Sequence, residues 1–515
     1  MIHKIQFLCA ILLFVVSFSF SQTTQIPDTN FEQALIDLGL DNTLDGSIPT
    51  NNISSITNLE IENRNIGNLT GIEDFISLRS LDCSGNQLIN FDISNNIQLE
   101  QLFCSNNQLT NINISNNTNL EILWCYNNLL TNIDVSNNTN LFSFRCNDNL
   151  LTNIDVSNNS ILNTFICESN QVAQIDVSQN PELDIFSCSN NLLTELNLTQ
   201  NLKLRQLECN FNMLTLLDVS QNKELNTLLC FNNALIELDT SKNTSLNILH
   251  CNDNQLTNLD LFNNINLSEI HCFNNNLRTL NFSENKDLIY LDCHNNNLCT
   301  LDLRQGNNTN ITFMDAKLNP ELACIFVDDV IYSNNNWVTY IEGISSFVSS
   351  ESECNVLNPL TPQVDSLQDV IDISFSLPTL SNGNYYTGPQ GSGIPLNAGD
   401  IITNTQTIYI YNSNGCFDNE SSFDVIITNK KIFIPKFFTP NNDGKNDLWK
   451  IIDLENNVKS ITIYNRYGKL VKFISPNSKG WDGTFNSMLL PNDSYWYSIL
   501  LNDANILHGC FALKR

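Results

Sequence analysis

The chain reads LEILWCYNNLLTNIDVSNNTN from Leu120 to Asn140, and nearly the same string recurs at a step of 21 residues. A fixed short period indicates one small structural unit stacked many times, because such a unit cannot bury its apolar face without neighbours. We therefore predict a solenoid. The period is marked by eleven cysteines, each with asparagine three positions later: Cys83, Cys104, Cys125, Cys146, Cys167, Cys188, Cys209, Cys230, Cys251, Cys272 and Cys293.

Each repeat contains an alternating segment followed by a bend. Leu123 and Cys125 alternate with Trp124 and other side chains, and successive side chains of a β-strand point to opposite sides. We therefore expect a short strand with Leu123 and Cys125 inside. Asn128 falls at the bend, where a buried amide satisfies backbone groups that leucine could not. The later apolar pair, Ile133 and Val135 in NIDV, should lie on the opposite side of the coil, where the chain runs back.

This pattern resembles the leucine-rich repeat family, whose LxxLxLxxNxL string appears here as LEILWCYNNLL with cysteine in the third apolar slot. The resemblance implies a mainly β fold with few helices, in which parallel strands line one concave face. We expect this solenoid to be followed by two small β-sandwich domains of the immunoglobulin-like kind.

The chain has 17 cysteines, which in an exported protein would ordinarily suggest a disulfide framework. The ladder cysteines replace core leucines, and cysteine packs as a small hydrophobe. Equivalent positions of neighbouring strands lie about 4.8 Å apart, which is too far for the Cβ atoms of a disulfide. We predict free buried thiols in the ladder, and a disulfide between Cys324 and Cys354, which lie outside it.

The two ends of the chain differ from its middle. The start, MIHKIQFLCAILLFVVSFSFSQ, has the basic residue and short apolar run of a secretory signal peptide, and no other stretch is long enough for a membrane span. The formal charge of −30 argues against nucleic acid as a partner. Residues 430–515 carry 12 Lys and Arg against 7 Asp and Glu, whereas the preceding residues carry 12 against 47. This break indicates a separate C-terminal domain.

These observations predict how the chain is organised. DTNFEQALIDLGL should form a capping helix that Asp28 or Thr29 begins, with Phe31, Leu35 and Leu38 on one face. Phe326, Val327, Ile331 and Trp337 should close the other end of the solenoid. The expected segments are a signal peptide (1–21), an N-terminal cap and degenerate repeat (22–77), the repeat solenoid (78–310), a C-terminal cap (311–354), a small β-sandwich (355–429) and a C-terminal domain (430–515).

The last segment contains a set of specific motifs. A TPNNDGKND opening runs from Thr439 to Asp447, and IYNRYG, a WDG turn, LPNDSYWY and a terminal Arg515 follow it. These residues resemble the type B C-terminal sorting domain of the type IX secretion system, also called the gliding motility-associated C-terminal domain. Asp493 and Ser494 stand where that family usually carries Gly-Thr. The resemblance implies export across the outer membrane through the type IX machinery, to the cell surface or the medium.

The sequence contains no recognisable catalytic motif, whether GxSxG, HExxH, a Walker loop or GxGxxG. We predict that the protein is not an enzyme and needs no cofactor. The segment NNDGKND resembles a calcium loop only loosely, because it lacks the distal glutamate of that motif, and we interpret it as a turn.

The concave strand face is the candidate functional site. Aromatic side chains exposed in a parallel array leave apolar surface uncovered unless a ligand binds there. The alternative is that neighbouring side chains cover one another along the ladder. The candidate ligand-binding residues flank the ladder cysteines: Phe103, Trp124, Tyr126, Arg145, Glu168, Glu208, Phe231, His250, His271, Phe273, Asp292 and His294.

Three of the five histidines lie on this face. His250, His271 and Asp292 should share one column with about 4.8 Å between neighbours. Two imidazoles and a carboxylate can hold zinc, but ligands in a straight column do not converge well, so we predict no metal site and favour hydrogen-bonding contacts to a ligand.

The sequence therefore predicts an exported, monomeric surface protein that binds or adheres to a protein or glycan partner through the concave face. A structural or matrix spacer without a specific ligand is the main alternative. A second alternative is an enzyme whose active site carries no recognisable motif.

Overall fold

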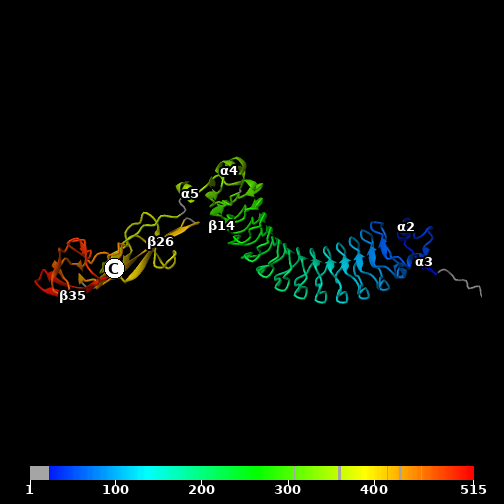
Figure 1. Ribbon diagram of the computed structural model, residues 1–515, viewed down its shortest axis with the longest axis horizontal. Helices are drawn as coiled ribbons and strands as arrows, with labels where there is room; N and C mark the ends of the chain where they lie inside the picture. Colours follow the sequence, from blue (N-terminus) through cyan, green and yellow to red (C-terminus); the bar gives the residue numbers. More distant parts are fainter. Residues whose placement is uncertain are drawn as a thin grey trace, which may run out of the picture. The chain divides into compact units, whose positions relative to one another are not determined.

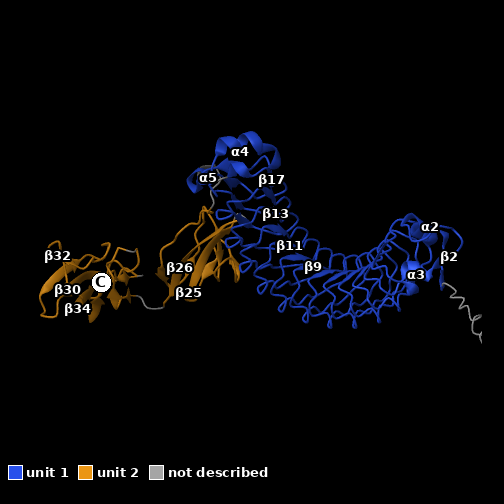
Figure 2. Cartoon of the chain, turned by 45° about the vertical axis from the view of Figure 1, so that its right-hand side comes forward, with its two compact units in different colours: residues 1–358 blue, residues 359–515 orange. Residues whose placement is uncertain are grey.

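The computed structural model of the chain describes residues 22–306, 308–357, 361–413, 416–428, 432–442, 444–453 and 455–515. The predicted signal peptide, residues 1–21, lies outside them. The chain divides into two units, residues up to 358 and residues from 359 onward (Figure 2). The first unit holds one continuous hydrophobic core, and the second holds two.

Thirteen short parallel strands line one side of the first unit (Figure 1). The middle side chain of each strand is buried, and the register places Leu102, Leu123 and Phe144 side by side in successive coils. Equivalent side chains therefore stack along the sheet. In spatial order the strands are β3 (Asn58–Glu60), β4 (Ser80–Asp82), β5 (Gln101–Phe103), β6 (Ile122–Trp124), β7 (Ser143–Arg145), β8 (Thr164–Ile166), β9 (Ile185–Ser187), β10 (Gln206–Glu208), β11 (Thr227–Leu229), β12 (Ile248–His250), β13 (Glu269–His271), β15 (Tyr290–Asp292) and β17 (Phe313–Asp315).

The predicted solenoid is confirmed, and its strands run beyond the expected 78–310 in both directions, from Asn58 to Val348. The return side of the last coils forms a second parallel sheet of four strands. Its strands are β14 (Thr279–Asn281), β16 (Thr300–Asp302), β18 (Cys324–Phe326) and β19 (Ser346–Val348).

The eleven ladder cysteines are free and buried, each at the end of a strand with its side chain in the core. Burial raises the pKa of every one of these thiols, and it raises that of Cys209 and Cys251 to about 12. The cysteines therefore act as small apolar core residues.

A ladder of asparagines, eight of them buried and four half-buried, satisfies the backbone at the first bend of each coil. The Nδ2 of Asn149 donates to the carbonyl oxygens of Cys146 and Cys125, both at 3.1 Å, and its Oδ1 accepts the N–H of Leu130 at 3.0 Å. One side chain thereby joins two coils. The prediction that the Asn128 amide satisfies backbone groups at the bend is confirmed, because it makes the equivalent hydrogen bonds. The same two donations are made by Asn86, Asn107, Asn128, Asn170, Asn191, Asn212, Asn233, Asn254, Asn275, Asn296 and Asn319.

A second asparagine ladder, which the sequence analysis did not identify, lies at the opposite bend. Asn138 is fully buried, and its Nδ2 donates to the carbonyl oxygens of Asn117 at 2.8 Å and Ile114 at 3.2 Å in the preceding coil. In one coil the hydroxyl of Thr240 donates to the Oδ1 of Asn264 at 2.9 Å. The ladder comprises Asn96, Asn117, Asn138, Asn159, Asn180, Asn201, Asn222, Asn243, Asn264 and Asn285.

The bend after each strand requires a left-handed backbone conformation, with positive φ, at the residue two positions after the cysteine. In ten coils this residue has φ between 51° and 55°, and in an eleventh it is Gly85. Asn and Asp tolerate this conformation best among residues with a side chain, and they fill eight of the ten positions. The exceptions are Ser169 and Phe211.

The N-terminal end of the solenoid is closed by the predicted helix, α2 (Thr29–Asp37), with β1 (Thr23–Gln25), β2 (Ser47–Pro49), α3 (Thr50–Ile53) and η1 (Ile72–Asp74). The Asp28 carboxylate begins the helix by accepting the N–H groups of Asn30 and Phe31, both at 2.9 Å. Phe31 and Leu35 are buried as expected. The prediction for Leu38 is wrong: it follows the last helical residue and is 44% exposed, because the chain turns away there.

The C-terminal end is closed by η2 (Asn308–Asn310), α4 (Val330–Asn336), η3 (Val338–Tyr340) and α5 (Glu351–Leu357). Phe326, Val327 and Trp337 are buried as expected, and a disulfide joins Cys324 to Cys354. Ile331 does not pack in the cap. It lies in the first turn of α4 and is 76% exposed, which corrects the prediction.

The second unit contains two small β-rich domains. Residues 361–428 hold a five-stranded sheet in the order β20 (Val370–Asp372), β26 (Asp418–Ile427), β25 (Gln406–Ser413), β22 (Asn384–Tyr386) and β23 (Pro395–Leu396), and a pair of β21 (Phe375–Ser376) with β24 (Ile401–Ile402). Residues 432–515 hold β28 (Phe437–Phe438), β35 (Ile506–Leu513), β34 (Asp493–Leu501), β30 (Val458–Tyr464) and β31 (Leu470–Ile474), with two pairs, β27 (Ile432–Phe433) with β29 (Ile452–Asp453) and β32 (Thr484–Phe485) with β33 (Met488–Leu489).

Aromatic side chains fill the core of the last domain. Trp449 stacks on Phe511 with ring centroids 3.9 Å apart, and Trp481 and Tyr495 pack edge to face beside them at an interplanar angle of 73°. In the NNDGKND segment the Asp447 carboxylate accepts the backbone N–H groups of Asn441, Asn442 and Gly444. This carboxylate therefore holds a turn.

We predict that the ladder thiols are protected in the folded protein. At about pH 8 an alkylating reagent should modify the exposed Cys510 and leave the eleven ladder cysteines unmodified, because burial excludes the reagent and suppresses the thiolate. Mass spectrometry after labelling under native and then denaturing conditions measures this. Rapid labelling of several ladder thiols before unfolding would contradict the packing described above.

Replacing Asn149 by Leu should lower the free energy of unfolding by about 1–3 kcal/mol, because it leaves the Leu130 N–H buried without a partner. The carbonyl oxygens of Cys125 and Cys146 each lose one of two amide donors and keep the other, from Asn128 and Asn170. Chemical denaturation of the mature chain measures the loss. Asn153→Leu, at an exposed position of the same coil, is the matched control and should change stability little. Equal effects of the two substitutions would show that the amide contributes no specific hydrogen bonding.

Candidate ligand-binding face

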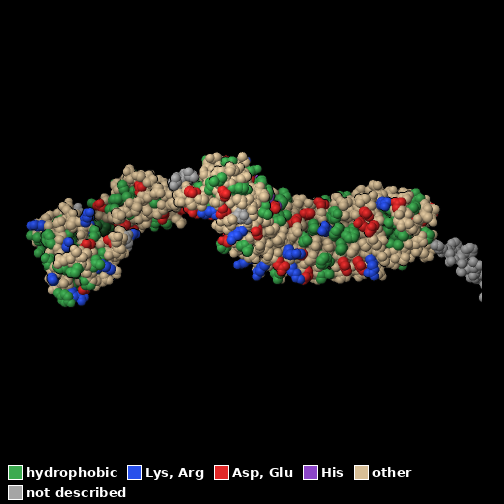
Figure 3. Space-filling model, turned by 45° about the horizontal axis from the view of Figure 1, so that its top comes forward, with side chains coloured by type: hydrophobic (Ala, Val, Ile, Leu, Met, Phe, Trp, Pro, Cys, Tyr) green, Lys and Arg blue, Asp and Glu red, His purple; other side chains and the backbone are tan. Residues whose placement is uncertain are grey.

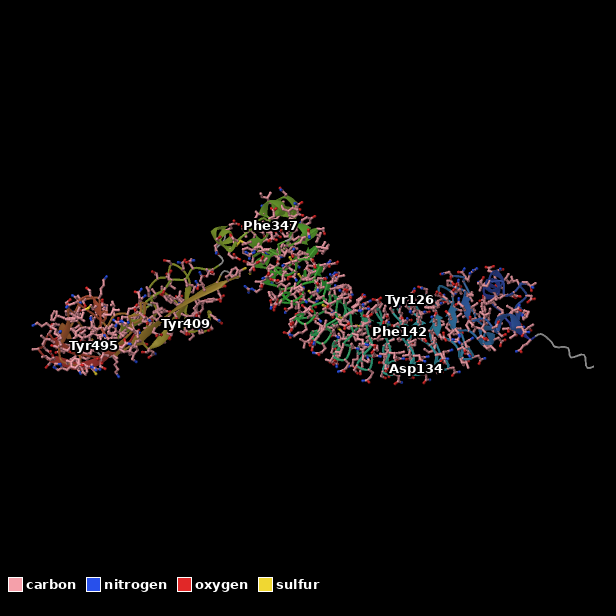
Figure 4. The ribbon with its side chains drawn as sticks, viewed as in Figure 1. Tyr126, Asp134, Phe142, Phe347, Tyr409 and Tyr495 are labelled. Atoms are coloured by element: carbon pink, nitrogen blue, oxygen red, sulfur yellow. A yellow bond between two sulfur atoms is a disulfide. The ribbon has the colours of Figure 1, made fainter. Side chains whose placement is uncertain are left out.

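The concave face consists of the outward side chains of the thirteen-stranded sheet, at positions three before, one before and one after each ladder cysteine. Figure 4 places Tyr126 on this inner side of the arc and Asp134 on the opposite margin. The pairings His250 with His271 and His271 with Asp292 confirm the predicted column. Every predicted ligand-binding side chain on this face is half-buried, except Asp292, which is buried.

The N-terminal part of the face combines two rings and a cation. Phe103 meets Trp124 edge-on at 4.9 Å, and the guanidinium of Arg145 lies 4.4 Å from the centre of the Trp124 ring. The indole N–H of Trp124 donates to the hydroxyl of Ser143 at 3.2 Å. The Nε of Arg145 is buried and has no hydrogen-bond acceptor within the described residues. This group can present a positive charge to an anionic ligand.

The middle of the face is acidic. The Ser187 hydroxyl lies 3.2 Å from a carboxylate oxygen of Glu168 and 3.3 Å from one of Glu208, and Gln206 donates to Glu208 at 2.6 Å. Burial raises the pKa of Glu168, and its hydrogen bond with Ser187 opposes that rise while the Glu208 and Asp148 carboxylates add to it. This zone favours a cationic or hydrogen-bond-donating group on a ligand.

A continuous stack of rings covers the C-terminal part of the face, here named the aromatic–imidazole stack. Its successive centroid distances are 5.2, 6.4, 4.1, 4.7, 4.4 and 5.9 Å, and it comprises Phe211, Phe231, His250, His271, Tyr290, Phe313 and Tyr340. Phe273 stacks on His294 at 4.6 Å beside it, and the His294 Nδ1 lies 2.6 Å from an Asp292 oxygen. Lys317 lies 5.5 Å from the centre of the Tyr340 ring.

The structure thus gathers the predicted residues into three zones, and it adds residues that the sequence analysis missed. Glu269, Tyr290 and Phe313 all lie three positions before an inward-facing residue of the ladder, as do Gln206 and Ile122. Strand alternation puts these positions on the same face as the residue just before the cysteine. The signal was therefore present in the sequence, but only the residues directly flanking each cysteine were considered.

Comparison with known proteins identifies the two parts of the chain. Residues 432–510 match the CHU_C Type IX secretion signal domain. No curated protein matches the sequence. The fold is similar to the functional domain of InlJ from Listeria monocytogenes, which includes a cysteine ladder: the two are 25% identical with a TM-score of 0.54, over 79% of this chain and 99% of that one.

A second solved structure, the internalin InlF from Listeria monocytogenes, is 20% identical with a TM-score of 0.55, over 64% of this chain and 98% of that one. The chain therefore has a leucine-rich repeat fold joined to a type IX secretion signal, and this signal indicates export. Within the described residues, no helix has the length and apolar character needed to cross a membrane. Figure 3 shows both acidic and basic side chains on the solenoid, and basic side chains also lie on the surface of the C-terminal unit.

Deleting residues 432–515 should leave the solenoid folded and hold it in the periplasm, because the deleted segment has its own core and carries the secretion signal. Cell fractionation of full-length and truncated protein, with a periplasmic marker, measures this. Undiminished appearance of the truncated protein outside the cell would show that export does not depend on this domain.

Proposed function

We propose that the exported protein binds a protein or glycan partner through the concave face and thereby acts in adhesion at the cell surface, without catalysis. The observation that carries the proposal is Phe211. This bulky residue occupies the left-handed position of its coil with φ 53°, and it is 49% exposed beside Phe231 at one end of the aromatic–imidazole stack.

Stability alone does not favour phenylalanine at this position. A left-handed backbone costs a residue with a Cβ about 1–2 kcal/mol, and the equivalent positions of other coils mostly hold Asn or Asp, which tolerate it better. An exposed ring held in an unfavourable conformation is typical of a functional surface. The ring also extends the apolar surface of the stack toward solvent.

The chemistry of the three zones limits the ligand. Rings at both ends suit apolar side chains or the faces of sugar rings, and interface aromatics commonly contribute much of the binding energy. Glu168 and Glu208 suit basic or hydroxyl groups between them, and Arg145 suits an anionic group near the N-terminal end. A protein segment or a glycan with such groups matches this arrangement.

The alternative function is that of a structural or matrix spacer. It is favoured by the mutual coverage of the stacked rings, which leaves every member of the predicted set half-buried or buried without any ligand. A spacer gains nothing from a strained, exposed phenylalanine at position 211. The effect of replacing Phe211 therefore distinguishes the binding function from the spacer function.

Phe211→Asn should hold or raise the melting temperature, since it relieves about 1 kcal/mol of backbone strain and makes no cavity, while it weakens binding at least about fivefold. Glycan and surface-protein arrays probed with the mature chain, residues 22–515, identify the partner. Titration of wild type and variant with that partner then measures the change in affinity. Ile236→Asn, which removes a side chain that is 55% exposed on the return side, is the matched control. Absence of any binding partner, or unchanged affinity of Phe211→Asn, would favour the spacer.

A further inference from the structure

Two histidines and a glutamate converge at the centre of the aromatic–imidazole stack. One oxygen of Glu269, Oε1, lies 2.9 Å from the Nε2 of His250 and 3.2 Å from the Nε2 of His271. All three potential ligand atoms lie within 4.8 Å of one another. Glu269 and His271 come from β13 and point to the same side because they are two residues apart, and His250 comes from the neighbouring β12.

We propose that His250, Glu269 and His271 form a binding site for a divalent transition-metal ion of the zinc class. The site goes beyond the proposed partner binding and does not depend on it. It also differs from the column of His250, His271 and Asp292 that the sequence suggested and that we set aside because its ligands do not converge. Glu269 supplies the convergence, because its carboxylate reaches between the two imidazoles.

The donor atoms nearly match the geometry that zinc requires. Zinc binds histidine nitrogen and carboxylate oxygen at about 2.0–2.2 Å in a tetrahedron, so neighbouring ligand atoms lie on the order of 3.3 Å apart. The two nitrogen–oxygen distances of 2.9 and 3.2 Å are already close to this value. The two imidazole nitrogens lie within 4.8 Å of each other, so they must move closer by up to about 1.5 Å to complete the tetrahedral arrangement.

The surroundings favour the ligand form of the His271 imidazole. His271 stacks flat against Tyr290, with ring centroids 4.7 Å apart and planes at 8°, so the Tyr290 ring supports one face of this imidazole. Burial lowers the pKa of His271 and the neighbouring His250 lowers it further, although Glu269 and Asp292 oppose the shift. A neutral imidazole is the form that binds metal.

The donor set also selects the metal. Two imidazoles and one carboxylate suit zinc and its neighbours in the first transition row, whereas calcium and magnesium prefer oxygen ligands throughout. The side chains of His250, His271 and Glu269 are 22%, 21% and 37% exposed, so the fourth coordination position faces solvent. A water molecule or a donor group of a bound partner can occupy it.

Isothermal titration of the mature chain, residues 22–515, with Zn²⁺ tests the site. The wild type should bind one Zn²⁺, and His250→Gln, Glu269→Gln and His271→Gln should each weaken binding at least about tenfold, while Mg²⁺ and Ca²⁺ should not compete. His508→Gln, at an exposed histidine of β35, is the matched control and should bind as the wild type does. No zinc binding, or equal affinity in all four variants, would overturn the proposal.

X-ray absorption of the zinc-loaded wild type gives a test that needs no variant. We expect two imidazole ligands with the remaining ligands oxygen, at about 2.0–2.2 Å. Sulfur in the first coordination shell, or a single imidazole, would place the metal elsewhere and refute the site. Both measurements leave partner binding untouched, so failure of the metal site is distinguishable from failure of the proposed function.

Discussion

The structure depends on how a coil of only 21 residues satisfies its buried backbone. Three-residue strands leave most of each coil as bends, and buried amide and carbonyl groups without partners are costly. Two asparagine ladders supply those partners, one at each bend. Each ladder amide donates to a backbone carbonyl oxygen of the preceding coil, and in the first ladder it also donates to one of its own coil. A coil therefore completes its hydrogen bonding only when its neighbour is in place. This constraint couples the coils and fixes their register.

The fixed register in turn creates the functional surface. Equivalent side chains repeat at the strand spacing, so rings at equivalent positions of adjacent coils come into contact. Tyr290 and Phe313 meet almost face to face at 4.4 Å, and Phe103 and Trp124 meet edge-on at 4.9 Å. The same spacing brings His250 and His271 together with centroids 4.1 Å apart. The surface is therefore preorganised by the backbone, and a ligand need not order it on binding.

The period, the inward strand positions and the first asparagine ladder follow from the sequence because each depends on alternation or on a single repeated residue. Asn138 was not predicted to be buried, since NIDVSNN has the composition of an exposed loop. Glu269 and Tyr290 were missed because they lie three residues before the cysteine rather than next to it. The tilt of Trp124 under Arg145 and the approach of Glu269 to two imidazoles depend on rotamers, which a periodic pattern does not specify. Leu38 and Ile331 were misplaced because both lie at helix ends, where a shared face no longer determines burial.

The central claim is that buried asparagine amides hold the coils together, and side-chain amide hydrogen exchange tests it most directly. Nuclear magnetic resonance of mature chain labelled with ¹⁵N at asparagine reports each side-chain NH₂ group separately. The account predicts two protected classes of amide, belonging to the two ladders, which exchange only when the solenoid unfolds, and rapid exchange for surface residues such as Asn153. Ladder amides that exchange as fast as surface ones would contradict it.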